Sequence, residues 1–98
     1  SYIVAITTAT RKDNRVRMGA SPRASRALYQ ASKAWAAMNG RKFVTPDDIK
    51  EIAHDVLDHR VLLEDSVSFS GIKVSQIIDE ILEKTEPSPT VKDLLNEK

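Results

Sequence analysis

The residues best suited to chemistry form a predicted helix start at residues 19–24, Gly-Ala-Ser-Pro-Arg-Ala. Ser21 is a favoured N-cap residue, and Pro22 suits the first helical position because its missing N–H is not needed there. Arg23 then falls in the first turn, where unpaired backbone N–H groups already make the helix end positive. A cation at this place is mildly unfavourable unless an anion approaches it. Because helix-end amides and a planar guanidinium together grip phosphate well, the pattern predicts an anion site.

Arg26 follows Arg23 by three residues, a spacing that places both side chains on one face of a helix. Two interpretations of Arg23 stay open from its position alone. In the first, it binds an anion. In the second, it is an exposed arginine, or one that pairs with an acid from the second half of the chain.

Other catalytic and metal-binding patterns are absent from the sequence. The three glycines are isolated, so there is no GxxxxGK[ST] phosphate loop, and neither GxSxG nor HExxH occurs. The lack of cysteine excludes a thiolate nucleophile and a thiolate metal site. His54 and His59 are five residues apart, whereas neighbours on one helix face are three or four apart, so we expect no metal site. We interpret the acids that follow Pro46 as a solvated helix face: Asp47, Asp48, Glu51 and Asp55.

Hydrophobic spacing predicts that helices carry these residues. Residues 2–12 repeat apolar side chains at helical spacing, and a basic loop is predicted over residues 14–18. The clearest helix spans 21–39 and stops at Asn39-Gly40. Its predicted buried stripe is Ala24, Ala27, Leu28, Ala31, Ala34, Trp35 and Met38, and Tyr29 lies off this stripe.

The second half of the chain adds two more predicted helices. One begins at Thr45, with Pro46 in its first position, and the other spans 73–83. Residues 41–44 and 59–63 look extended, and we predict that 59–63 pairs with Phe43-Val44 as a minimal two-stranded ribbon. Residues 64–72 are predicted to be loop, and Pro87-Ser88-Pro89 to end the last core helix. The fold class is therefore all-α, a small bundle of about four helices with this ribbon.

Length and charge set further bounds. The 98 residues make one domain, and no apolar run approaches the ~20 residues that span a bilayer. Without a signal peptide or cysteine, we expect a cytoplasmic protein, and the missing initial methionine suggests a piece of a longer chain. The net charge is +1, but the first 42 residues hold nine Lys/Arg and one acid, while residues 43–98 carry an excess of acids over bases. Either the basic half faces an anionic partner, or the two halves attract each other.

Ordered sequence blocks carry a family resemblance. Residues 19–24 resemble the sensor 2 motif of the MoxR family of AAA+ ATPases. The other blocks resemble the family's first lid helix (2–4 and 9–11), its GRxFVTPxDI connection (40–49), its VLxHR segment (56–61) and its closing helix (77–82). The resemblance identifies residues 1–89 as a C-terminal helical lid domain. Residues 90–98 have no counterpart and are expected to be a short helical turn or a disordered tail.

The resemblance implies a role within a larger ATPase. An α/β core, absent from this chain, would bind ATP and Mg, and Arg23 would contact the ATP γ-phosphate, with Ser21, Pro22 and Arg26 also at the nucleotide. The chain alone lacks Walker motifs and should be inactive. The parent would couple ATP hydrolysis to chaperone-like assembly or activation of a client complex. Implied partners are the core, neighbouring subunits of a homo-oligomeric ring, commonly a hexamer, and a protein with a von Willebrand factor A domain.

Two other functions remain as alternatives. The basic first half is compatible with a helical nucleic-acid-binding module, although the low net charge and the few aromatic residues argue against nucleic acid. The exposed position predicted for Tyr29 is compatible with a protein-interaction module that does not contact nucleotide.

Overall fold

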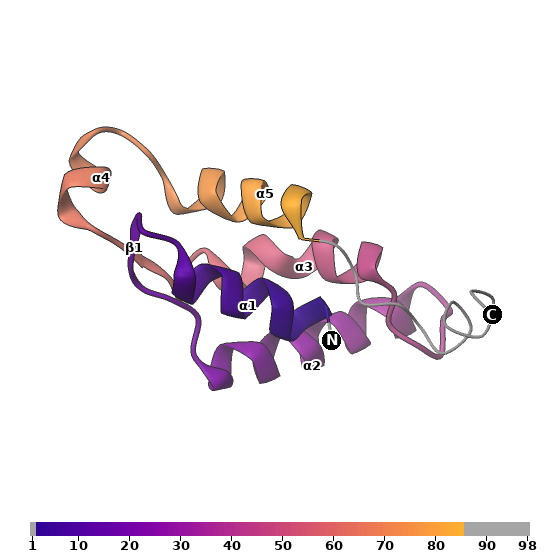
Figure 1. Cartoon of the computed structure of the whole chain (residues 1–98). Coiled ribbons are helices and arrows are strands. Elements are labelled where there is room, and N and C mark those ends of the chain that lie inside the picture. Colours follow the sequence, from indigo (N-terminus) through magenta and orange to yellow (C-terminus); the bar gives the residue numbers. More distant parts are fainter. Residues whose placement is uncertain (1, 86–98) are drawn as a thin grey trace, which may run out of the picture.

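Five helices and two short strands make up residues 2–85, the part of the chain that the computed structural model describes (Figure 1). In chain order they are α1 (Tyr2–Lys12), β1 (Val16–Met18), α2 (Pro22–Met38), α3 (Pro46–Leu57), β2 (Leu62–Leu63), α4 (Asp65–Phe69) and α5 (Val74–Lys84). The predicted class, a small helical bundle with a two-stranded ribbon, is confirmed. The predicted Pro87-Ser88-Pro89 linker and the tail at 90–98 lie outside the described residues.

The two central helices begin where the sequence predicts. Ser21 caps α2 by accepting a hydrogen bond from the Ala24 N–H, at 3.2 Å, and Pro22 occupies the first position. Thr45 caps α3, and the Asp48 carboxylate accepts a reciprocal bond from the Thr45 N–H, at 2.8 Å. Both starts use local side-chain bonds to satisfy backbone groups that have no helical partner.

The core lies where four helices meet. α2 packs along α3, α1 packs against α2 and α5, and α5 also packs on α3 (Figure 1). Small side chains such as Ala24 and Ala53, both fully buried, let the helices approach closely. The larger buried side chains that fill the interior are Ile6, Leu28, Leu57, Ile77 and Ile78. The apolar spacing predicted for residues 2–12 is confirmed in outline, since Tyr2, Ile3 and Ile6 are buried.

The ribbon has a different partner from the predicted one. β1 pairs antiparallel with β2, with Val16 opposite Leu63 and Met18 opposite Leu62, so the predicted pairing with residues 43–44 was wrong. Residues 16–18 were predicted to be loop, and a three-residue strand is too short to show a periodic pattern. Within the predicted loop 64–72, the structure has the short helix α4.

The buried face of α2 is narrower than predicted. Its buried residues recur every fourth position, at Ala24, Leu28, Ser32 and Ala36. Met38 is 79% exposed and Ala34 is also exposed, so their place in the stripe was wrong, and Trp35 is only half-buried. α2 packs chiefly on α3, and one main neighbour covers a narrower stripe than a surrounding core does.

The acidic face predicted for α3 is wrong at one residue, which is buried. Asp48 is 1% exposed, because its carboxylate lies at the start of α3 and pairs with the Arg41 guanidinium. Asp47, Glu51 and Asp55 are exposed, as predicted. Within residues 2–85, no helix has the length and apolar character needed to cross a membrane.

Candidate functional site

The Gly19–Ala24 segment is held against the end of α1. Gly19 lies so close to Arg11 that a Cβ at this position would come within 2.6 Å of the Arg11 Cα. Next to it, the buried Ala20 donates its N–H to the Thr10 hydroxyl, at 2.9 Å. The Ala20 carbonyl accepts a hydrogen bond from the Arg11 guanidinium, at 2.5 Å. These contacts fix where α2 begins relative to α1.

Buried hydroxyl groups extend this attachment into the first turn of α2. The Ser25 hydroxyl donates to the Thr7 hydroxyl at 3.0 Å, and the Thr7 hydroxyl donates to the Ile3 carbonyl at 3.0 Å. Thr7 and Thr10 are fully buried. These polar contacts are not predictable from local sequence, since threonine inside a helix is compatible with either an exposed or a buried position.

Arg23 and Arg26 lie on the opposite, outer side of the same helix start. Both side chains are exposed, and neither side chain makes a hydrogen bond or ion pair with another residue of the described range 2–85. With Pro22 they line a shallow hollow of about 220 Å³. The first turn of α2 contains no acid. Pairing of Arg23 with an acid of the second half, one of the two sequence-based interpretations, is therefore not observed within residues 2–85.

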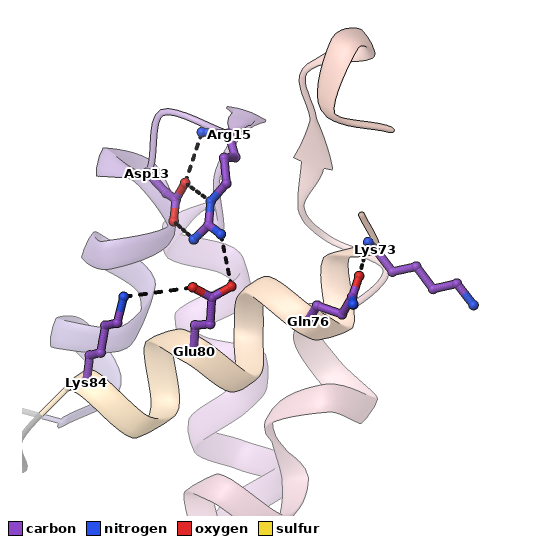
Figure 2. Close-up of polar contacts among 6 residues, drawn as sticks. All are labelled: Asp13, Arg15, Lys73, Gln76, Glu80 and Lys84. Carbon is purple, nitrogen blue, oxygen red and sulfur yellow. Dashed lines mark hydrogen bonds and ion pairs between the residues drawn. The ribbon is translucent and has the colours of Figure 1, made fainter. Parts of the chain in front are cut away.

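Other cations of the basic half are engaged inside the domain. The Arg15 guanidinium contacts the carboxylates of Asp13, at 2.8 Å, and Glu80, at 2.9 Å, and so joins the α1–β1 turn to α5 (Figure 2). Its hydrogen bonds with Asp13 lower the pKa of that carboxyl, and the two carboxylates raise the pKa of Arg15. Lys84 approaches Glu80 from the next turn of α5, at 3.8 Å. The attraction between halves, left open by the sequence, is present here.

His54 connects α3 with α5. Its Nδ1 lies 3.0 Å from the Asp58 carboxylate and its Nε2 lies 2.6 Å from that of Asp79. Burial opposes the charged imidazolium, but the hydrogen bonds with the two carboxylates outweigh it and raise the pKa of His54. His54 is thus a bridge between helices, whereas His59 is exposed. Residues 2–85 contain no cluster of His, Cys, Asp and Glu suited to hold a metal.

Comparison with known families gives this geometry a context. The sequence pattern of the family described as AAA lid domain matches residues 8–81. The chain belongs to the AAA lid domain family. The matched residues thus include the helix start at residues 19–24, all of α2, α3 and α4, the end of α1 from residue 8 and α5 as far as residue 81.

Relatives of the lid come from bacterial proteins that are longer. It is 42% identical over 81 residues to the uncharacterized protein YeaC of Bacillus subtilis, covering 83% of this chain and 25% of that protein. It is 34% identical over 91 residues to the chaperone MoxR1 of Mycobacterium tuberculosis, covering 84% of this chain and 24% of that protein. Protein MoxR of Methylorubrum extorquens is 32% identical over 77 residues, covering 79% of this chain and 22% of that protein. The lid is therefore related to MoxR-family AAA+ ATPases and spans about a quarter of each relative's length.

A solved structure shares the fold. A crystal structure of a candidate ATPase from Cytophaga hutchinsonii superposes on the lid with a TM-score of 0.83 at 36% sequence identity. The match covers 89% of this chain and 29% of that one. The lid fold therefore occurs as the smaller part of a longer polypeptide.

Proposed function

We propose that this lid contacts the phosphates of ATP bound to the AAA+ core of its parent protein and couples nucleotide state to lid position. One observation carries the proposal: Arg23 and Arg26 are exposed at the start of α2 and make no ion pair within residues 2–85. Cations in the same half of the chain, such as Arg15 and Arg41, are paired with acids. Arg23 and Arg26 are thus available for an anion supplied from outside the lid.

The residues at this helix start fit a phosphate chemically. Ser21 and Pro22 set the first turn, whose positive end favours an anion. The Arg23 guanidinium acts as the sensor 2 residue, donating hydrogen bonds to γ-phosphate oxygens as their charge develops. Arg26, one turn further, adds a second positive charge. ATP and Mg are held by the core's Walker motifs, so the lid alone has no ATPase activity.

The attachment of this segment to α1 supports coupling. Movement of Arg23 toward phosphate displaces Ala20, which is hydrogen-bonded to Thr10 and Arg11. The four packed helices then move together, because a close-packed core does not deform continuously. In the parent, this motion drives the chaperone-like assembly or activation of a client complex. The partners proposed with it are ring neighbours, in a hexamer, and a protein with a von Willebrand factor A domain.

The test uses the full-length parent ATPase with Arg23→Ala and, as a matched control, Arg17→Ala, which removes an exposed arginine of β1. Arg23→Ala is expected to lower kcat by about 100-fold or more, the scale for losing a donor to developing charge, with a much smaller change in ATP affinity. Arg17→Ala should keep normal turnover. Turnover within about twofold of wild type in Arg23→Ala would reject the assignment.

A further inference from the structure

A second hollow lies at the far end of α2 from Arg23. One wall of this hollow is α2, with Tyr29, Ala36 and Ala37. The other wall is the loop at residues 41–44 that leads to α3. The groove measures about 710 Å³, and the Phe43 ring on its rim is 68% exposed. Alanines make its floor flat and apolar. This surface is suited to receive an apolar side chain.

The charges on this groove are all positive. Lys33 lies over the Tyr29 ring, at 5.3 Å from its centre, and Lys42 is exposed on the loop. Neither lysine forms an ion pair within the described residues, and no carboxylate lines the groove. Arg41 is already paired with Asp48. The groove therefore favours an apolar side chain that is accompanied by acids.

A segment with this chemistry projects from the other end of the same domain. α4 stands away from the bundle, at the end opposite the loop between α2 and α3 (Figure 1). Its last residue, Phe69, is 88% exposed, the highest value among the exposed large hydrophobic side chains of residues 2–85. Glu64 and Asp65, at the start of α4, are also exposed. An aromatic side chain this exposed, on an element that projects from the bundle, is available for contact with a partner.

We propose that α4 of one copy of this chain docks in the α2 groove of a second copy, with Phe69 against Tyr29 and Phe43 and with Glu64 and Asp65 facing Lys33 and Lys42. The arm and the groove lie at opposite ends of a domain 46 Å long, so an arm does not reach its own groove. Each copy gives one arm and accepts another. Such a head-to-tail contact between unlike surfaces builds rings or open chains of copies. The contact does not involve Arg23 or Arg26 and stands independently of the nucleotide proposal.

Sedimentation of the 98-residue chain tests the contact. The wild-type average mass is expected to rise above that of a monomer as concentration increases from about 10 μM to about 1 mM, the range of weak contacts. Phe69→Ser and the double change Lys33→Glu/Lys42→Glu should each leave a monomer, because each weakens association by about tenfold or more. These side chains are exposed, so circular dichroism should show an unchanged fold. Val4→Ser, an exposed apolar side chain on α1, is the matched control and should associate normally.

Mixing the two variants tests the head-to-tail geometry. Phe69→Ser keeps an intact groove, and Lys33→Glu/Lys42→Glu keeps an intact arm, so the mixture should form a one-to-one complex that extends no further. A wild-type chain that stays monomeric over the whole range overturns the proposal. So does association that Phe69→Ser leaves unchanged, or a mixture of the two variants that stays monomeric. Loss of association on truncation after Thr85 would assign the groove to residues 86–98 instead.

Discussion

Gly19 occupies a position that tolerates no side chain. A Cβ there would lie 2.6 Å from the Arg11 Cα and 2.7 Å from its Cγ, which is closer than real Cβ atoms come. The contact involves backbone, so neither partner can turn away. Gly40 is different, because it has a φ of 78° and open space where a Cβ would lie.

Gly19→Ala is therefore expected to separate the helix start from α1 and to lower the free energy of unfolding by roughly 1–3 kcal/mol, as overpacking does. Gly40→Ala, the control, should cost about 1 kcal/mol, because alanine is strained at positive φ although it meets no neighbour. Urea unfolding of both variants gives the comparison. A smaller loss for Gly19→Ala than for Gly40→Ala would contradict the close packing.

The predictable part of the site is the local part. Ser21 and Pro22 were assigned from helix-start rules, which depend on residues within one turn and hold in any fold. The bonds from Ala20 to Thr10 and from Ser25 to Thr7 join segments more than nine residues apart. No periodic or capping pattern marks such partners, so the sequence alone does not predict these hydrogen bonds.

At the scale of helices, His54 joins α3 to α5 through the carboxylates of Asp58 and Asp79. Its pKa is raised in the folded state, so the protonated bridge stabilises the fold fully below the ordinary histidine pKa of 6.5. This stability is lost as pH rises through the raised pKa. We expect the urea midpoint to fall between about pH 6 and pH 8 in wild type. His54→Gln should flatten that part of the profile, and an equal slope in the variant would reject the bridge.

Element predictions succeeded where a pattern runs over several turns. The starts of α2 and α3 combine capping with apolar spacing, and both agree with the prediction within about a residue. The ribbon was paired wrongly because the partner of a two- or three-residue strand is chosen by the fold and not by local sequence. α4 spans five residues, too few for a helical period to appear.

Across the whole molecule, the separation of charge along the chain has two consequences. Part of the basic half neutralises the acidic half, through Arg15 with Glu80 and Arg41 with Asp48. Other cations of this half, among them Arg23 and Arg26, are exposed. The two interpretations of the charge asymmetry are thus compatible, because different arginines carry them.

Substitutions at the Arg15–Glu80 pair test how much the attraction between the two halves of the chain contributes to stability. Both side chains are partly exposed, at 32% and 41%, so water screens them. Glu80→Gln is expected to lower the free energy of unfolding by roughly 0.2–1 kcal/mol, the range of exposed ion pairs. Arg15→Gln should cost more, since it also removes the partner of Asp13. Lys84→Gln, a control for the 3.8 Å contact with Glu80, should have the smallest effect.

A double-mutant cycle isolates the pair from these side effects. Arg15→Gln, Glu80→Gln and the combined variant, unfolded in urea at low salt, give a coupling free energy that excludes the bond to Asp13. We expect this coupling to shrink toward zero at about 1 M salt, where screening acts over about 3 Å. A coupling that is already zero at low salt would mean that packing of the helices, without charge, holds α5 against the α1–β1 turn. In that case the acids of the second half would be available to bind partners outside the domain. The basic groove at the end of α2 binds such a partner in the proposed contact between copies.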